Sequence, residues 1–552
     1  MKINSLLLTA MSALFSSFIS AEKAKPNIIL IMADDMGYSD LGCYGGEINT
    51  PNLDALAAGG VRFSQFYNGA RCCPTRASLM TGLYPHEAGM GAMTPSKFRD
   101  RGPSYQGFIS SNAVTIAEVL KKAGYITAMT GKWHAGNYQP DQWPESRGFE
   151  KFYGIHHWVD SYWKVLKECD VYHDGRLVIQ PTDTPVNQLH PDQEFYTTDV
   201  FTDWALTYID EAGAAKKPLF MYVAYNAPHW PLEAPDEDIA HYKGMYDEGW
   251  EGLREKRLEH LIEMGLLPKH TTLSKAENRP DWNSLSEDDR KNSAFRREIY
   301  AAQIDRMDQN VGRIVKKLKE REMYKNTLIL FLSDNGCSAE DGMLGYKFKE
   351  NRIHNFPGWR KESGRSSSQG KTWSNVSNAP FKKHKKVAFE GGSRTPLIAH
   401  WPEGLKNPGR ISHEPGHITD IMSTCIDLAG TVYPKEYNGN QIKPAPGLSL
   451  LPLLQAKQRD SHKAIFCEHW NSAFVRSKNW KLVTLNYQDP RRWELYNLND
   501  DPCETQNLRS EFPEKTAELY DLFINWSSDV RVLPKPASML EKPRVELHIQ
   551  NN

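Results

Sequence analysis

The sequence predicts an α/β protein whose large sheet is mixed but mostly parallel and lies between helices, followed by a smaller C-terminal α+β domain. Three observations support this prediction. Short apolar runs alternate with amphipathic stretches up to Gly430, the pattern of a sheet covered by helices on both faces. The 552 residues exceed what one modest core organises. After Gly430 the alternation stops and short strand-like pieces replace it.

The elements of the large sheet follow one another along the chain. The first strand, 27–32, is a continuous apolar run, as expected of a strand buried on both faces. Apolar residues three and four positions apart from Ile304 to Leu318 predict a helix with one buried face. The further elements expected here are helix 115–123, strand 125–129, helix 199–213, strand 218–224, strand 327–332, strand 396–400 and helix 420–429.

Two long polar segments interrupt this alternation. Residues from Pro231 to about Arg296 are charged and contain scattered Pro, Gly and Trp, and Asp341–Lys386 is rich in Ser, Lys, Gly and Asn. Loops of such length are more often functional than idle. We therefore expect substrate specificity to come from 236–296, from 341–384 and from the C-terminal domain.

The C-terminal part contains strand-like pieces at 473–476, 480–485 and 493–498 and a helix at 513–526. These predict a small α+β domain with an antiparallel sheet. We place the boundary near 431–445. The resulting division is a signal peptide at 1–21, a large domain at 22–435 and a C-terminal domain at 436–552.

The N-terminus has the layout of a secretory signal peptide. Lys2 precedes an apolar stretch from Leu6 to Ile19, and Ala21 is the expected last residue removed before the charged Glu22. The stretch is too short for a spanning helix, no Cys follows it to carry a lipid, and no later segment has the length of a membrane span. The sequence predicts a periplasmic or secreted protein.

Composition excludes some partners and gives one oddity. The 67 Lys and Arg against 68 Asp and Glu leave a net charge of −1, so no overall electrostatic attraction to nucleic acid or to an anionic membrane is expected. Eight cysteines in so long a chain do not form a disulfide framework. The adjacent pair Cys72-Cys73 is unusual because neighbouring cysteines rarely bridge and no second pair completes a zinc-like spacing.

Polar residues follow four of the predicted strands. In an open α/β sheet, ligands bind beyond the carboxyl ends of the strands, so these residues are candidates for the functional site. The clusters are Asp34-Asp35 after the first strand, Lys132-Trp133-His134 after the second, Asn226-Ala227-Pro228-His229 after the third and Asp334-Asn335 after the fourth.

The acidic pairs indicate a metal site only in combination. Asp34-Asp35 alone is typical of a turn or a helix start, and Asp334-Asn335-Gly336 alone is typical of a turn. Two such pairs at strand ends of one sheet can close around a divalent cation. Carboxylate and amide oxygens suit Ca²⁺ or Mg²⁺, whereas zinc favours His or Cys ligands.

The lysines and histidines are weaker signals when each is taken alone. Lys132, His134 and His229 would then be solvated loop residues, although the prolines on both sides of His229 restrict its backbone. Lys385 lies in a basic run of the kind usually found on a surface. Its position before Glu390-Gly391-Gly392 distinguishes it, because the two glycines permit a close backbone approach or a positive φ.

The segment 71–82 decides the interpretation. A proline-started helix with buried cysteines would explain Cys72-Cys73-Pro74 by itself. However, Cys72-x-Pro74-x-Arg76 followed by Ala-Ser-Leu-Met-Thr-Gly resembles the signature of the type I sulfatase family, part of the alkaline phosphatase superfamily. In that family the first Cys is oxidised to Cα-formylglycine. The resemblance assigns this modification to Cys72 and makes Cys73 a variable position.

The resemblance covers nearly the whole chain, with its motifs in family order. Tyr242–Pro268 and the insertion before Lys385 are most similar to the bacterial arylsulfatase branch. The other matching segments are 27–37, 50–54, 131–134, 227–231, 333–336, Lys385 with 390–392, 480–482 and 493–502.

The resemblance implies a sulfuric ester hydrolase that cleaves sulfate monoesters to an alcohol and inorganic sulfate. A geminal diol on formylglycine would supply the nucleophile. A cation, Ca²⁺ rather than Mg²⁺, would lower the pKa of the attacking hydroxyl. The residues implied to hold it are Asp34, Asp35, Asp334, Asn335 and the modified Cys72.

The resemblance also implies roles for the other polar residues. Asp334 would be the base for the attacking hydroxyl, and His134 would take a proton from the remaining one, so that sulfate leaves and the aldehyde returns. Arg76 would orient the modified residue. The side chains implied to neutralise the sulfuryl oxygens are Lys132, His229 and Lys385, with His229 or Lys385 assisting the leaving alcohol.

Two alternatives stay open at this stage. A phosphodiesterase or phosphonate monoester hydrolase would use the same modified residue, and a catalytically silent protein would bind sulfated glycans without cleaving them. The expected partners are an aryl sulfate or sulfated carbohydrate and a formylglycine-generating or anaerobic sulfatase-maturating enzyme. His156-His157-Trp158 and Trp373 could stack on sugar rings or simply pack.

Overall fold

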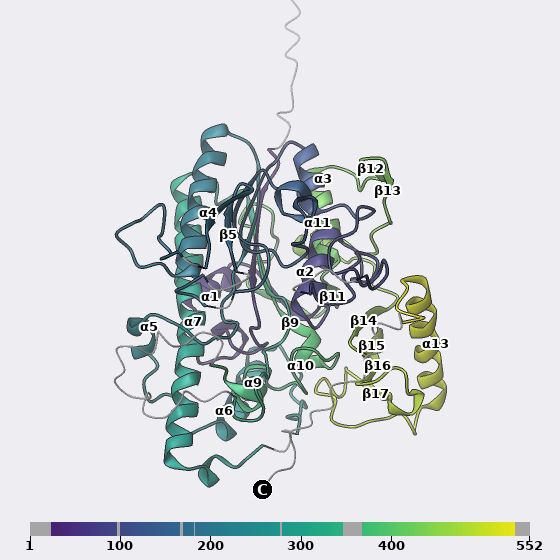
Figure 1. Cartoon of the computed structure of the whole chain (residues 1–552). Helices are drawn as coiled ribbons and strands as arrows, with labels where there is room; N and C mark the ends of the chain where they lie inside the picture. The colour runs from purple at the N-terminus through teal and green to yellow at the C-terminus, as the bar shows by residue number, and fades with distance from the viewer. Residues whose placement is uncertain are drawn as a thin grey trace, which may run out of the picture.

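The computed structural model describes residues 24–95, 100–159, 161–165, 169–181, 183–275, 279–345 and 367–535. It confirms the predicted fold class, a large mixed sheet between helices with a separate C-terminal antiparallel sheet (Figure 1). The predicted signal peptide and part of the second insertion lie outside the described residues. None of the helices in the described ranges combines the length and apolar character of a membrane span.

The large sheet has 11 strands, and its central neighbours β8, β1, β7 and β3 are parallel. In spatial order the strands are β10 (Arg410–Ser412), β2 (Val61–Tyr67), β9 (Arg394–His400), β8 (Thr327–Ser333), β1 (Asn27–Ala33), β7 (Leu219–Ala224), β3 (Ile126–Lys132), β4 (Lys151–Ile155), β5 (Val171–His173) and β6 (Arg176–Ile179), with β11 (Gly416–His417) beside β2.

The helices fill both faces of this sheet and the two long insertions. Those described are α1 (Pro51–Ala58), α2 (Cys72–Thr81), α3 (Ile116–Lys122), α4 (Thr197–Ala215), α5 (Asp236–Ala240), α6 (Glu251–Glu263), α7 (Glu287–Glu320), α9 (Gly370–Ser377), α10 (Glu390–Ser393), α11 (Asp420–Ala429), α12 (Leu451–Leu454) and α13 (Pro513–Asp529). The predicted helices and central strands correspond to described elements, with boundaries shifted by a few residues.

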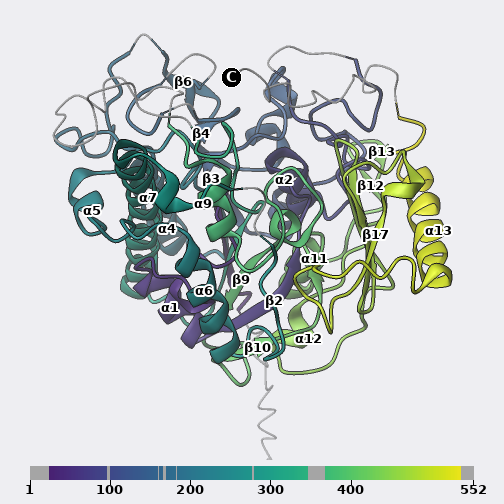
Figure 2. The same ribbon diagram turned by 90° about the horizontal axis from the view of Figure 1, so that it is seen from below.

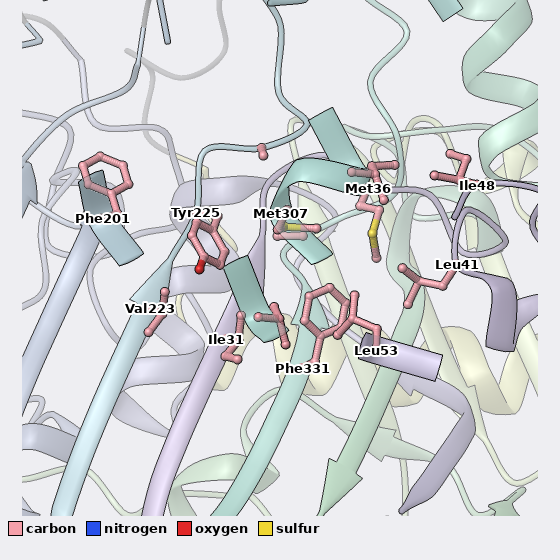
Figure 3. Packing of buried hydrophobic residues seen from close by; sticks show 14 of the residues in the cluster. Ile31, Met36, Leu41, Ile48, Leu53, Phe201, Val223, Tyr225, Met307 and Phe331 are labelled. Carbon is pink, nitrogen blue, oxygen red and sulfur yellow. The ribbon is translucent and has the colours of Figure 1, made fainter. Parts of the chain in front are cut away.

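Alternate residues of the strands enter two different cores, because side chains point to opposite faces of a sheet. Ile29 and Ile31 of β1 pack on the face covered by α1, α4 and α7, whereas Leu30 packs on the face covered by α2, α3 and α11. Figure 3 shows Ile31 and Phe331 on the first face, close to Leu53 and Met307. Each fully buried side chain of this size contributes about 1.5–3 kcal/mol.

Local sequence explains where some helices begin. The Thr115 hydroxyl accepts from the Glu118 backbone N–H while the Glu118 carboxylate accepts from the Thr115 N–H, a capping box that fixes the start of α3. Ser286 caps the long helix α7, whose first turn is acidic. Helix α7 therefore begins inside the segment predicted as a polar excursion.

The C-terminal sheet contains β14 (Ile465–His469), β15 (Ser472–Ser477), β16 (Trp480–Thr484) and β17 (Glu494–Asn497), all antiparallel neighbours. Helix α13 packs on one face of it (Figure 2). The small hairpin of β12 (Glu436–Tyr437) and β13 (Asn440–Gln441) lies between the two sheets in the sequence. The domain division at 435 and 436 stays a prediction.

A buried ionic cluster, which we call the interdomain cluster, connects the two sheets. It consists of Glu390, Arg394, Lys481, Glu504 and the Tyr67 hydroxyl. The Lys481 ammonium lies 2.7 Å from Glu390 and 2.9 Å from Glu504. Glu390 also accepts from the Tyr67 hydroxyl at 2.9 Å and pairs with Arg394 at 3.2 Å. Beside the cluster, an apolar contact layer that includes Phe389 and Phe474 closes the interface.

Some features differ from expectation. Strands β2, β4, β5 and β6 were not predicted. Strand β9 runs antiparallel to β8 and β2. Trp373 is fully buried and packs edge-on against Trp250 and Trp282, so its role is packing and not stacking on a sugar.

Candidate active site

Six chain segments meet at one edge of the large sheet. The strands β8, β1, β7 and β3 are parallel neighbours, so their carboxyl ends lie at the same edge. The residues that end or follow them there are Asp334, Asp34, His229 and Lys132. Because β9 is antiparallel to β8, its beginning lies at this edge, and Lys385 precedes it through α10. Because β2 is antiparallel to β9, its carboxyl end also lies here, and Cys72 follows it.

Cys72 is the first residue of α2 and is 2% exposed. The N-terminus of a helix favours negative charge, since its backbone N–H groups lack partners. A hydrogen bond from Cys73 lowers the pKa of the Cys72 thiol well below its usual value, burial opposes this, and Lys132 and His134 assist it. The site therefore favours an electron-rich oxygen or sulfur at this position.

Arg76 lies one helical turn after Cys72 and faces the same side of α2. Its Nε and Nη2 donate to the Asp334 carboxylate at 3.1 and 3.0 Å, and its Nη1 donates to the Lys132 carbonyl at 2.8 Å. The guanidinium is fully buried. It thus fixes the start of α2 against the ends of β8 and β3.

The carboxylates of Asp34, Asp35 and Asp334 are crowded and buried. Asp334 accepts from the Asp35 backbone N–H at 3.2 Å, and the Asn335 Nδ2 donates to Asp35 at 2.7 Å. Burial and the neighbouring Asp34 raise the pKa of Asp334 well above its usual value. Burial is the largest single influence on Asp34 and acts to raise its pKa, but Lys132, His229 and Arg76 together outweigh burial and the pKa is lowered.

Two lysines meet these carboxylates. The Lys132 ammonium donates to Asp34, and the Lys385 ammonium lies 2.6 Å from Asp35. Both side chains are almost completely buried. Burial acts to lower the pKa of Lys385, yet attraction to Asp35, Cys72 and Asp34 together leaves it raised, so this lysine stays charged. The sequence run that contains Lys385 is therefore not a simple surface patch.

The two histidines present a ring nitrogen to the site. His229 Nδ1 lies 2.5 Å from the Trp230 carbonyl and must donate to it, which leaves Nε2 facing Asp35 at 3.5 Å. Burial lowers the pKa of His229. A nitrogen of His134 lies within 4.8 Å of the sulfurs of Cys72 and Cys73, and burial lowers its pKa to about 3.

The donor set fits a hard cation. Asp34 Oδ1 and Asn335 Oδ1 are buried oxygens that have no hydrogen-bond partner among the described residues. Unpartnered buried oxygens are costly, and three crowded carboxylates add repulsion. A divalent cation would relieve both. The oxygen donors match the Ca²⁺ and Mg²⁺ chemistry expected from the sequence.

Backbone conformation marks the same region. Asp35, Ala70 and His134 have positive φ values of 68°, 54° and 52° although none is glycine. Left-handed conformations of such residues cost about 1–2 kcal/mol each and concentrate at functional sites. Gly391 and Gly392 instead have ordinary φ values, and a Cβ on Gly392 would meet the Val387 carbonyl oxygen at 2.1 Å. Close approach is what these glycines provide.

The structure adds residues that no local sequence pattern connected to the site. Arg71, the residue before Cys72, stacks on Trp470 of the C-terminal domain, with its guanidinium carbon 4.9 Å from the ring centre. His469 is buried beside Trp470.

Comparison with known proteins decides the family. The Sulfatase family model matches residues 26–431, and the model for N-sulphoglucosamine sulphohydrolase, C-terminal, matches residues 381–521. The chain belongs to the sulfatase family. This sulfatase is a hydrolase of sulfate esters, as the resemblance of its motifs implied.

Relatives agree with this assignment over most of the chain. The sulfatase is 34% identical to an arylsulfatase of Klebsiella aerogenes, covering 80% of this chain and 94% of that protein. It is 30% identical to an uncharacterized sulfatase of Schizosaccharomyces pombe, covering 94% and 96%. The solved structure of Ps i-CgsB in complex with k-i-k-neocarrahexaose is 27% identical, has a TM-score of 0.65 and covers 93% and 94%.

Proposed function

We propose that this sulfatase cleaves sulfate monoesters with a formylglycine made from Cys72 and a Ca²⁺ ion held by Asp34, Asp35, Asp334 and Asn335. The observation that carries the proposal is the convergence of three carboxylates and the cations Arg76, Lys132 and Lys385 beside the N-terminus of the helix that Cys72 begins. A sulfate ester needs cations around its oxygens and an oxygen nucleophile, and this arrangement supplies places for both.

Formylglycine would supply a geminal diol with one hydroxyl to attack sulfur and a second to expel sulfate, and Ca²⁺ would lower the hydroxyl pKa. Asp334, held by Arg76, is the base proposed for the attacking hydroxyl. His134 is the base proposed for the second hydroxyl, because its ring nitrogen lies within 4.8 Å of the Cys72 sulfur.

The remaining charged groups would act on the substrate. Lys132 and Lys385 neutralise the sulfuryl oxygens in this proposal, with His229 beside them. The fixed Nδ1–H of His229 leaves Nε2 free to exchange a proton with the leaving alcohol, with Lys385 as the other candidate donor. The Arg76 guanidinium already donates to the Asp334 carboxylate and the Lys132 carbonyl, which supports an orienting role and not substrate binding.

We propose a sulfated glycan as the natural substrate and the periplasm or the exterior as the place of action. The neighbour solved with k-i-k-neocarrahexaose and the predicted signal peptide support this. A formylglycine-generating or anaerobic sulfatase-maturating enzyme would modify Cys72 before the chain folds. The rival of a phosphonate monoester hydrolase gains no support from the matched family models, both of which are sulfatase models.

Two measurements test the proposal together. Mass spectrometry of the Cys72 peptide from a maturing host is expected to show a loss of about 18 Da, the change from thiol to aldehyde. Parallel assays with 4-nitrophenyl sulfate and bis(4-nitrophenyl) phosphate are expected to favour the sulfate ester. An unmodified thiol in an active preparation, or faster phosphodiester cleavage, would refute the proposed chemistry.

A further inference from the structure

The turn between β14 and β15 brings the C-terminal domain to the active site. Trp470 and Asn471 form this turn with positive φ values of 51° and 77°. The turn is held rigidly, since the Asn471 backbone N–H donates to Glu468 at 3.0 Å and Lys535 donates to the Asn471 side chain at 2.9 Å. Glu468 also bonds to His86 of the large domain at 2.9 Å. Trp470 therefore has a fixed place relative to α2.

Trp470 offers a ring surface next to the nucleophile position. Its side chain is 49% exposed, although it lies against Arg71, the residue that immediately precedes Cys72. The His469 ring stacks on it at 5.0 Å between centres and supports its orientation. The part of the Trp470 ring that Arg71 and His469 leave exposed is a large apolar surface against which a sugar or aryl ring could pack.

Arg71 is a cation with no hydrogen-bonded anion among the described residues. In the described part of the chain its Nε and Nη1 are buried and have no hydrogen-bond partner, and no carboxylate pairs with it. Its nearest charged neighbours include Lys385 and Lys386, whose pKa values it acts to lower, and Glu340, which is already paired with Lys386 at 2.6 Å. Partly buried charges are normally paired, so this position calls for an external anion.

The sulfate to be cleaved is served by other groups. Lys132, Lys385 and His229 contact Asp34 and Asp35, on the side where the proposed mechanism places the cleaved sulfate. Arg71 instead lies toward the C-terminal domain, over the Trp470 ring. An anion bound at Arg71 would thus belong to the sugar, or other alcohol, that carries the ester oxygen, and not to the sulfate that is cleaved. Stacking of that part on Trp470 and pairing with Arg71 would occur together.

We infer that Arg71 and Trp470 form a substrate subsite for a sugar ring that bears a second anionic group, a sulfate or a carboxylate, besides the sulfate that is removed. This inference rests on the proposed function and names its substrate class. A neutral monosulfated ring would use the stacking surface alone. A doubly charged ring would use both residues.

Binding measured by calorimetry on the Cys72→Ala protein with Ca²⁺ tests this without turnover. The probes are N-acetylgalactosamine 6-sulfate, its 4,6-disulfate, and a disaccharide that joins the 6-sulfated sugar to a uronic acid. The second sulfate or the carboxylate is expected to tighten binding about tenfold, the gain of one charge-assisted contact. Comparing the last two probes tells which anion the subsite prefers.

A second substitution in the Cys72→Ala protein shows which residue causes the tighter binding of the doubly charged probes. Arg71→Ala is expected to erase the advantage of the doubly charged probes, Arg71→Lys to keep part of it, and Trp470→Ala to weaken all three. Arg491→Ala, which removes an exposed arginine of the C-terminal domain, is the control. If Arg71→Ala weakens all probes equally, Arg71 binds the cleaved sulfate and the subsite is disproved. If no probe binds, the proposed glycan substrate itself fails.

Discussion

Two buried ionic clusters of this sulfatase use the same residue types in different ways. In the interdomain cluster, both carboxylate oxygens of Glu390 accept hydrogen bonds, one oxygen of Glu504 accepts from the Glu390 backbone N–H, and the other oxygen of Glu504 lies 2.9 Å from the Lys481 ammonium in an ion pair without a hydrogen bond. In the active-site cluster, Asp34 Oδ1 and Asn335 Oδ1 have no hydrogen-bond partner among the described residues. The interdomain cluster thus places a cation or a donor beside every carboxylate oxygen, whereas the active-site cluster leaves two oxygens unmatched, as the proposed cation site requires.

The largest effect expected concerns Cys72. Cys72→Ala should abolish sulfate release while the circular dichroism spectrum stays like that of the wild type, because the change removes the nucleophile's source and touches no strand. Cys73→Ala is the matched control and should retain turnover, since only Cys72 takes the modified position. Residual turnover by Cys72→Ala above that of a heat-killed sample would contradict the mechanism.

Removal of the cation should come next in size. A chelator such as EGTA is expected to abolish turnover and to lower the melting temperature, because the active-site cluster then keeps unpaired oxygens. Ca²⁺ at about a hundred times its Kd should restore about 2.7 kcal/mol of stability. Asp35→Asn should weaken that thermal response. The interdomain cluster has no proposed cation, so it should not contribute to the fall in melting temperature. A melting curve that EGTA leaves unchanged would therefore refute the metal site.

The interdomain cluster should instead respond to the loss of one of its own members. Lys481→Met leaves Glu390 and Glu504 buried without their shared cation, and the free energy of unfolding should fall by about 3–5 kcal/mol. Lys382→Met breaks a partly exposed pair with Glu494 and should cost about 0–1 kcal/mol. Urea unfolding measures both. Equal losses for the two variants would show that the interdomain cluster carries no special stability.

The smallest expected effect is a pH dependence at Glu504. Burial raises its pKa to about 7 from 4.5, with Lys481 opposing, so the folded state binds its proton more tightly than the unfolded state does. The stability it contributes is therefore present below pH 4.5 and is lost as the pH rises through 7. Glu504→Gln should gain melting temperature relative to the wild type at pH 8 and not at pH 4. The exposed Glu511→Gln should show no such difference between the two pH values.

The sequence predicted the sheet better than it predicted the partners of the site. The run 27–32 is apolar because both faces of β1 are buried. Once the strands β1, β3, β7 and β8 are located by their apolar runs, the polar residues at their carboxyl ends are located as well. Strand β2 escaped prediction because Arg62, Ser64 and Gln65 break its apolar pattern. Because β2 was not predicted, the sequence did not show that Cys72 also follows the end of a strand.

Long-range contacts were beyond the reach of local patterns. Glu390 and Lys481 are 91 residues apart, and nothing at either position indicates the other. Arg71 and Trp470 meet only because the C-terminal sheet docks against the loop that follows β2. The antiparallel direction of β9 brings Lys385 to the active-site edge, and the apolar composition of the strand does not reveal that direction.

The burial of α2 has a consequence for how the enzyme comes into being. All ten residues of this helix, Cys72 included, are buried in the folded chain. Under the proposed mechanism, a modifying enzyme would not reach a segment enclosed in this way, so Cys72 would have to be oxidised between synthesis and folding. The specific activity of a preparation would then depend on the fraction of chains oxidised before they fold. Two samples with identical sequence and identical fold would differ in activity for this reason alone.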